Sequence, residues 1–119
     1  MQAANKVSQQ QLTGASGQQI TCLHFTGDIS SVSKDAIVGT YQALDKASNK
    51  RILLDFKGVE YLNSSGIALV IQVLMEANKS GQTIGICGLT PHFTKVFTMV
   101  GITKYATIYA DEAAALSAL

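Results

Sequence analysis

The chain has 119 residues, of which 47% are hydrophobic and 14% are charged, and its formal net charge is +1. This composition excludes a disordered chain, and the near-neutral charge without a basic run argues against binding to nucleic acid or to a membrane surface. The length fits one domain over residues 1–119 with a hydrophobic core of its own, in which residues 1–5 are expected to fray.

The first part of the chain predicts a β-hairpin and then a helix. Residues 6–12 and 18–25 alternate between polar and apolar side chains, the first run only weakly, and a turn rich in Gly and Ser separates them. Residues 33–47 then have apolar side chains at helical spacing. We expect the buried side of this helix to carry Ala36, Ile37, Tyr41 and Leu44.

The rest of the chain predicts three further strands that alternate with three helices. Short apolar runs without helical spacing indicate strands, while capping residues and glycines mark the ends of helices. The predicted fold class is therefore α/β, a small mixed β-sheet of about five strands packed by about four helices through right-handed crossovers. We expect strands at 51–56, 83–89 and 106–109, and helices at 64–79, 91–100 and 111–119. The side chains expected to lie inward on the helix at 91–100 are Phe93, Val96, Phe97 and Val100.

The side chains that most often form metal or catalytic sites are scattered along the chain. Cys22 and Cys87 lack a Cys-x-x-Cys spacing, so we interpret them as small buried residues of a protein in a reducing cytosol. His24 and His92 have no ligand companion at suitable spacing, and Asp55 has no second carboxylate or nucleophile–base pair near it in the sequence. We predict no catalytic residue, no metal and no cofactor, and hence no enzyme.

The location predicted from the sequence is the cytoplasm. The first five residues are polar and do not form a signal peptide, and no apolar run approaches the ~20 residues of a membrane span.

The segment between the third predicted strand and the second predicted helix carries the most information. Residues 61–67 read Tyr-Leu-Asn-Ser-Ser-Gly-Ile, and Asn63 and Ser64 stand where helix N-caps occur. A helix N-terminus has unpaired N–H groups and tolerates added negative charge. From these residues alone, Ser64 is either an ordinary cap or a phosphorylation site.

Three segments resemble the signature of the STAS domain, a family named for sulfate transporters and anti-sigma-factor antagonists. Residues 55–67 are similar to the family's strand, its hydrophobic-Asp-Ser-Ser/Thr-Gly-Leu motif and the helix after it. Residues 89–102 are similar to its helix that starts with Ser/Thr-Pro and ends before Gly-Leu/Ile, and residues 25–29 to its Thr-Gly-Glu-Leu loop. The segments occur in the family's order, and the resemblance covers residues 5–118.

The resemblance implies a bacterial, single-domain anti-sigma-factor antagonist that works by partner switching. In that scheme the unphosphorylated protein binds an anti-sigma factor that is also a serine kinase, and a serine phosphatase reverses the phosphorylation. The residue that matches the phosphoacceptor is Ser64, with Ser65 as the alternative, and the protein alone is expected to be a monomer. The implied partner-binding surface consists of Gly27, Asp28, Ile29, Asn63, Ser64, Ser65 and Gly66.

The chain departs from the usual family motif at Asn63, where aspartate is common. Asparagine keeps the capping ability but removes a carboxylate from beside Ser64, which lowers repulsion toward a phosphate and weakens recognition by a kinase that requires the acid. We expect the N–H groups of Gly66 and Ile67 to receive the phosphate. The absent side chain of Gly66 is expected to let a partner approach the start of the helix.

Two other functions remain open on the sequence alone. One is a STAS subunit of a transport or sensory assembly, in which Ser64 is only a cap and binding is constitutive. The other is a small-molecule or nucleotide-binding module. Residues 85–88, Gly-Ile-Cys-Gly, give that last function no support because they lack the lysine and the glycine spacing of a phosphate loop.

Overall fold

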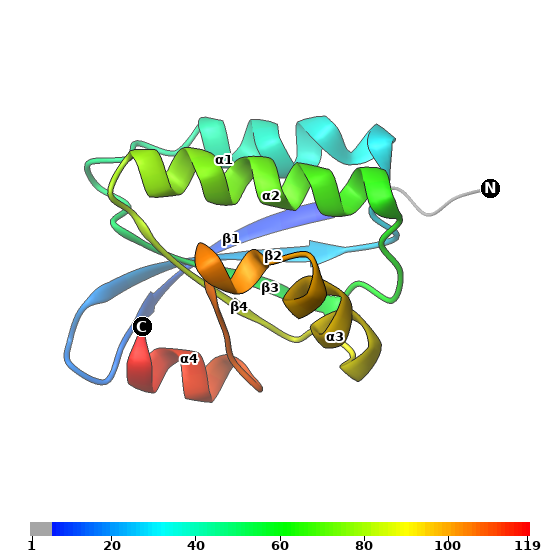
Figure 1. Cartoon of the computed structure of the whole chain (residues 1–119). Coiled ribbons are helices and arrows are strands. Elements are labelled where there is room, and N and C mark those ends of the chain that lie inside the picture. Colours follow the sequence, from blue (N-terminus) through cyan, green and yellow to red (C-terminus); the bar gives the residue numbers. More distant parts are fainter. Residues whose placement is uncertain (1–5) are drawn as a thin grey trace.

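The computed structural model describes residues 6–119, which contain one five-stranded sheet in the order β1-β2-β3-β4-β5 (Figure 1). β1 pairs antiparallel with β2, as the hairpin prediction requires, and β2 to β5 run parallel to one another. The predicted α/β class with a small mixed sheet is therefore confirmed. The strands are β1 (Lys6–Thr13), β2 (Gln19–Thr26), β3 (Arg51–Gly58), β4 (Thr83–Cys87) and β5 (Thr107–Ile108).

Three of the predicted helices occur within two residues of their expected bounds. They are α2 (Ser64–Lys79), α3 (Pro91–Met99) and α4 (Glu112–Ala118). Side chains at their N-caps explain where they begin, because Asn63, Thr90 and Asp111 each accept a hydrogen bond from the backbone N–H three residues later. Within residues 6–119, no helix is both long and apolar enough to cross a membrane.

The first helical segment differs from its prediction at both ends. It covers 31–42 rather than 33–47 and consists of η1 (Ser31–Ser33), η2 (Asp35–Gly39) and α1 (Thr40–Gln42). Asp45 explains the early end. Its carboxylate accepts hydrogen bonds from the N–H of Ala47 and the hydroxyl of Ser48, which stabilise a turn in place of a further helical turn.

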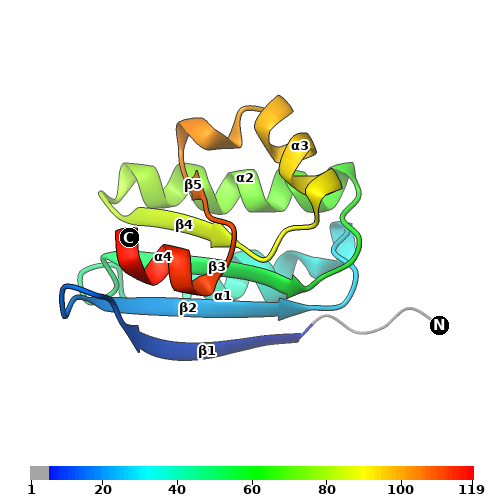
Figure 2. The same ribbon diagram turned by 90° about the horizontal axis from the view of Figure 1, so that it is seen from below.

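The helices are divided between the two faces of the sheet. α1 and α2 lie side by side over one face, while α4 covers part of the opposite face (Figure 1). The view from below places α4 in front of the sheet, with α3 beyond the β4 side (Figure 2). Backbone and side-chain bonds from the β1–β2 turn hold α4 in position: Ala15 N–H donates to the Leu116 carbonyl, and Gln18 Nε2 donates to the Leu119 carbonyl.

Each face of the sheet has its own apolar core. The larger core lies under α1, α2 and α3, where Phe56 of β3 packs against Phe25 of β2 and Phe97 of α3. The smaller core lies under α4. β3 contributes to both, which explains its nearly continuous apolar sequence. The buried members of the smaller core are Ile20, Cys22, Leu53, Cys87, Ala115 and Leu119.

The third predicted helix buries two of the four side chains expected to lie inward. Phe93 and Phe97 are buried, and Val96 is partly buried. Val100 is 50% exposed, so its prediction as a core residue is wrong. The helix ends at Met99 and the chain turns at Gly101, whose φ of +85° is a left-handed conformation that glycine adopts without a steric penalty. This turn directs Val100 away from the core.

Candidate functional site

The start of α2 is formed by a capping residue followed by two exposed serines. Asn63 is the N-cap, since its Oδ1 accepts a hydrogen bond of 2.9 Å from the N–H of Gly66. Ser64 and Ser65 are the first two residues of the helix, and both are exposed. No hydrogen bond joins either hydroxyl to any residue in 6–119. The structure therefore assigns the capping role to Asn63 and leaves the Ser64 hydroxyl accessible.

The backbone N–H groups available at this helix end differ from those expected. The N–H of Gly66 bonds to the Asn63 side chain, and the N–H of Ile67 donates 2.9 Å to the Asn63 carbonyl. Neither is available to receive a phosphate, so that expectation is wrong. Within the described part of the chain, the N–H groups of Ser64 and Ser65 make no hydrogen bond and are the ones that remain open at the helix terminus.

The loop after β2 is joined directly to the start of α2. The N–H of Ile29 donates 3.0 Å to the carbonyl of Tyr61, and the N–H of Asn63 donates 3.1 Å to the carbonyl of Ile29. These two bonds form a short parallel bridge between Ile29 and Leu62. Residues 27–29 and 63–66, which are more than 30 positions apart in the sequence, therefore form one continuous surface.

Two of the residues predicted to form the partner-binding surface are buried. Ile29 is 1% exposed, and Gly66 is buried. A Cβ atom on Gly66 would lie 2.4 Å from the carbonyl oxygen of Ile29, so the glycine is required by the contact between α2 and this loop. The exposed members are Asp28, Ser64 and Ser65. Ile29 and Gly66 thus position the loop against the helix rather than present side chains to a partner.

Two large exposed apolar side chains lie near the exposed serines. Val32 is 76% exposed in η1, a segment that contacts α2, and Tyr61 is 54% exposed three residues before Ser64. The Tyr61 ring packs edge-on against Phe93 of α3, with 6.3 Å between the ring centroids. Exposed side chains of this size are typical of protein contact surfaces. We refer to Gly27, Asp28, Val32, Tyr61, Asn63, Ser64 and Ser65 as the serine surface.

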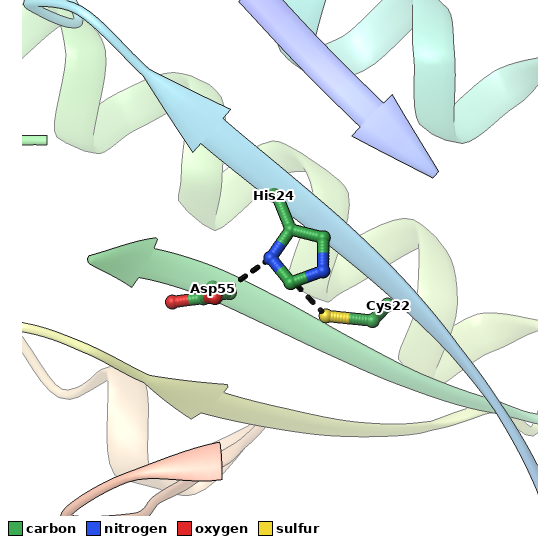
Figure 3. A group of neighbouring side chains, drawn as sticks. All are labelled: Cys22, His24 and Asp55. Atoms are coloured by element: carbon green, nitrogen blue, oxygen red, sulfur yellow. Dashed lines mark hydrogen bonds and ion pairs between the residues drawn. The ribbon is translucent and has the colours of Figure 1, made fainter. Parts of the chain in front are cut away.

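A second group of functional side chains lies on the other face of the sheet, which α4 partly covers (Figure 3). His24 Nδ1 is 2.7 Å from Asp55 Oδ2 and 3.9 Å from Cys22 Sγ. His24 Nε2 is 2.8 Å from Oε1 of Gln10 on β1. Figure 3 shows the three labelled side chains converging from the neighbouring strands β2 and β3.

The arrangement of this second group does not suit nucleophilic catalysis. Asp55 and Cys22 both approach the same imidazole nitrogen, whereas a nucleophile–base–acid relay requires the acid and the nucleophile on opposite nitrogens. Burial, together with the nearby Asp55 carboxylate, raises the pKa of Cys22 to about 12, so the thiol stays protonated at neutral pH. The group therefore contains no activated nucleophile.

The spacing of Cys22, His24 and Asp55 along the chain does not predict this grouping. One signal was present: Cys22 and His24 are two positions apart in a predicted strand and so point to the same face. The contribution of Asp55 depends on the register that places it opposite His24 across two parallel strands. That register becomes known only with the tertiary structure.

Comparison with known proteins agrees with the fold. A family model described as "Mlab, STAS domain" matches residues 12–109. The chain belongs to the STAS family. An anti-sigma F factor antagonist of Paenibacillus polymyxa is 25% identical over 96 residues, which span 81% of this chain and 77% of that protein.

Solved structures of other STAS proteins have the same architecture. An anti-sigma factor antagonist from Mycobacterium paratuberculosis superposes with a TM-score of 0.78 at 19% identity, covering 98% of this chain and 96% of that one. The Bacillus cell fate determinant SpoIIAA in its phosphorylated form gives a TM-score of 0.66 at 17% identity, covering 92% and 96% of the two chains. At these identities the similarity establishes the shared fold.

Proposed function

We propose that this STAS domain is an anti-sigma-factor antagonist that binds its anti-sigma factor through the serine surface and is released when Ser64 is phosphorylated. One observation carries the proposal. The exposed Ser64 hydroxyl, with no hydrogen-bond partner in residues 6–119, lies at a helix N-terminus that is joined to loop 27–29. The names of the Paenibacillus and Mycobacterium proteins, and the phosphorylated form of SpoIIAA, support the same role.

The folded domain can hold a phosphate on Ser64 without rearrangement. A phosphoserine brings about −1.5 to −2 charges at neutral pH. The open N–H groups of Ser64 and Ser65 and the helix dipole favour that charge by about 0.3–1 kcal/mol. Asn63 caps the helix without adding a carboxylate beside the phosphate. Phosphorylation is therefore expected to change the surface and to leave the fold intact.

The same charge opposes binding of a partner that fits the bare hydroxyl. Val32 and Tyr61 give the serine surface an apolar part, and an interface that covers them would also exclude water from Ser64. Burying a dianion against such an interface costs several kcal/mol unless the partner supplies compensating charges. The proposed role is binding rather than catalysis. In this scheme the partner anti-sigma factor carries the serine kinase activity, and a serine phosphatase restores the unphosphorylated form.

Phosphate transfer is the first test. The full-length protein is incubated with ATP and each kinase-type anti-sigma factor of the host cell, and intact-mass and fragment mass spectrometry locate the modification. We expect one phosphate on Ser64, lost in Ser64→Ala and retained in Ser65→Ala. Phosphate that persists in Ser64→Ala and disappears in Ser65→Ala would assign the acceptor to Ser65. No phosphate on either serine would reject the switch and favour a constitutive binding subunit.

A charge-mimicking variant tests release separately from phosphate transfer. Ser64→Asp is expected to weaken binding to the anti-sigma factor at least tenfold, while its melting temperature stays within a few degrees of that of the parent. Ser64→Ala is expected to bind as the parent does, and Ser117→Asp on the exposed side of α4 is the matched control. Equal loss of binding in Ser64→Asp and Ser117→Asp would mean that the serine surface is not the binding surface.

A further inference from the structure

We propose that Cys22, His24 and Asp55 form a binding site for a single divalent metal ion of the zinc type. The donor atoms are Cys22 Sγ, His24 Nδ1 and Asp55 Oδ2. One donor atom from each residue lies within 4.8 Å of the donors of the other two, which is close enough for one ion to reach all three. The proposal is independent of the role proposed for Ser64, which lies at the start of a helix on the opposite face of the sheet.

The strands hold the three donors together by their backbone geometry. Cys22 and His24 are two residues apart on β2, so their side chains leave the same face of the sheet. Asp55 is the registered partner of His24 on the parallel neighbour β3. Both strands belong to the central part of the sheet, so the backbone that carries the donors is rigid. The site therefore requires only side-chain rotations to bind an ion.

The second polar atoms of His24 and Asp55, Nε2 and Oδ1, have partners of their own, so the proposed donor atoms Nδ1 and Oδ2 face one another. His24 Nε2 lies 2.8 Å from Gln10 Oε1, which can accept a hydrogen bond from Nε2–H when Nδ1 binds an ion, and the backbone N–H of Lys57 donates 2.9 Å to Asp55 Oδ1. Metal-binding histidines and carboxylates characteristically have such partners on the atoms that do not contact the ion. These bonds select Nδ1 and Oδ2 as the inner atoms. A Cβ on Gly88 would lie 2.6 Å from Asp55 Oδ1, so only glycine leaves the carboxylate its present position.

The types of donor select the class of ion. A thiolate, an imidazole and a carboxylate together suit Zn²⁺ and similar transition-metal ions, whereas Mg²⁺ and Ca²⁺ require oxygen donors throughout. With bonds of about 2.0–2.1 Å to nitrogen and oxygen, a tetrahedral ion would separate Nδ1 and Oδ2 by about 3.3 Å. The present separation is 2.7 Å, so modest rotations of His24 and Asp55 open the space.

Binding replaces protons with the ion. In the metal-free protein the proton between His24 Nδ1 and Asp55 Oδ2 and the proton of the Cys22 thiol occupy the donor atoms. Coordination releases the thiol proton to solvent, because the charge of the ion stabilises the thiolate. The imidazole stays neutral: the ion takes the Nδ1 lone pair, and the ring proton then lies on Nε2, which donates to Gln10 Oε1.

An ion can reach the site from solvent. The His24 side chain is 25% exposed, and the Asp55 side chain is 10% exposed. Asp55 also lines a cavity of about 440 Å³ together with Lys57, Cys87 and the start of α4. Three protein donors leave the fourth tetrahedral position for a water molecule.

The test uses untagged full-length protein that has been treated with a chelator. Cobalt(II) titration is expected to produce a thiolate-to-cobalt charge-transfer band that saturates at one equivalent, and Zn²⁺ is expected to abolish it by competition. Cys22→Ser should lose the band and bind Zn²⁺ at least tenfold more weakly, as measured against a chromophoric chelator. The control His92→Gln, which changes an exposed histidine, should behave as the parent does. Cys87→Ser tests whether the other buried cysteine, the registered neighbour of Asp55 on β4, is the thiolate donor instead.

A second variant keeps the test informative if Cys22→Ser does not fold. Gln10 lies on the exposed edge strand, so Gln10→Ala should fold and bind Zn²⁺ about tenfold more weakly, because His24 loses its outer hydrogen bond. The parent protein should also melt at a higher temperature as free Zn²⁺ increases, by linkage. A parent protein without the cobalt band and without this rise in melting temperature would overturn the proposal. A band that survives in Cys22→Ser but not in Cys87→Ser would also overturn it.

Discussion

Asn63 makes three hydrogen bonds that position the serine surface. Its side chain accepts from the N–H of Gly66, its carbonyl accepts from the N–H of Ile67, and its N–H donates to the carbonyl of Ile29. The same residue therefore starts α2 and holds the loop after β2 beside it. The position of Ser64 follows from these bonds, because Ser64 is the next residue in the chain.

Removing the cap tests how far the helix start depends on Asn63. Asn63→Ala is expected to lower the free energy of unfolding by about 1 kcal/mol, within a range of roughly 0.5–2 kcal/mol, because the N–H of Gly66 loses its acceptor. Asn63→Asp keeps the acceptor and adds charge at the positive end of the helix, so it should be at least as stable as the parent. Urea unfolding measures both. Equal stability of Asn63→Ala and the parent would contradict the capping role.

The contact between Gly66 and the loop can be tested with a second glycine as the control. Gly66→Ala is expected to lower the free energy of unfolding by roughly 1–3 kcal/mol, because its Cβ would overlap the backbone of Ile29. Gly39 is also helical, with φ of −62°, and has no heavy atom within 4 Å of its Cβ position. Gly39→Ala should therefore raise stability by about 0.4–1 kcal/mol in the same urea experiment. A Gly66→Ala protein as stable as Gly39→Ala would refute the close contact.

At the scale of secondary-structure elements, a buried polar bridge fixes α1 against the start of β4. The Tyr41 hydroxyl donates to Oε1 of Gln82, and Gln82 Nε2 donates 2.8 Å to the carbonyl of Asn49. Tyr41 is fully buried, and Gln82 is 7% exposed. The helix α1 is only three residues long, so its position depends on tertiary contacts such as this one.

The hydroxyl of Tyr41 can be removed without changing the shape of the core. Tyr41→Phe is expected to lower the free energy of unfolding by roughly 1–3 kcal/mol, because it leaves the buried Oε1 of Gln82 without a donor. Tyr105→Phe is the matched control, since Tyr105 is 39% exposed. Guanidinium unfolding of both variants measures the difference. A loss of less than about 0.5 kcal/mol in Tyr41→Phe would mean that Gln82 finds another partner.

At the scale of the whole molecule, the two proposed sites lie on opposite sides of the sheet. The helices α1, α2 and α3 cover the larger core and carry the serine surface at the start of α2. The opposite face is covered in part by α4, the shortest of the three capped helices, and there the sheet presents both cysteines and the His24–Asp55 pair. A metal ion at the proposed site and a partner on the serine surface would therefore occupy separate surfaces.

The burial of both cysteines predicts their reactivity in the intact molecule. Burial raises the pKa of Cys22 and of Cys87 to about 12. At pH 8 the thiolate fraction is then about a thousandfold below that of a thiol with a pKa of 9, so labelling of the native, metal-free protein should be slow. Both cysteines should react fully with Ellman's reagent in guanidinium. Rapid labelling of one cysteine in the native protein would show that α4 opens locally.

The sequence predicts most elements well because their signals are local. α2 begins and ends as expected, since Asn63 caps its start and Ser80-Gly81 follows its last residue. The hairpin and the succession of strands and helices along the chain also follow from local patterns. The first helical segment is predicted less well because its end depends on the turn around Asp45, and Val100 is assigned to the core because helical spacing alone does not reveal the turn at Gly101.

By itself, the sequence determined the α/β class and the position of the Asn-Ser-Ser-Gly segment at a helix start, because caps and apolar periodicity act within a few residues. Its motifs also predicted the STAS family. Only the tertiary structure decided that Ile29 joins the start of α2, that the N–H groups of Ser64 and Ser65 are the open ones, and that Cys22, His24 and Asp55 converge. Those features depend on which backbone groups and strands meet across the sheet, and register is set by the packing of the whole domain.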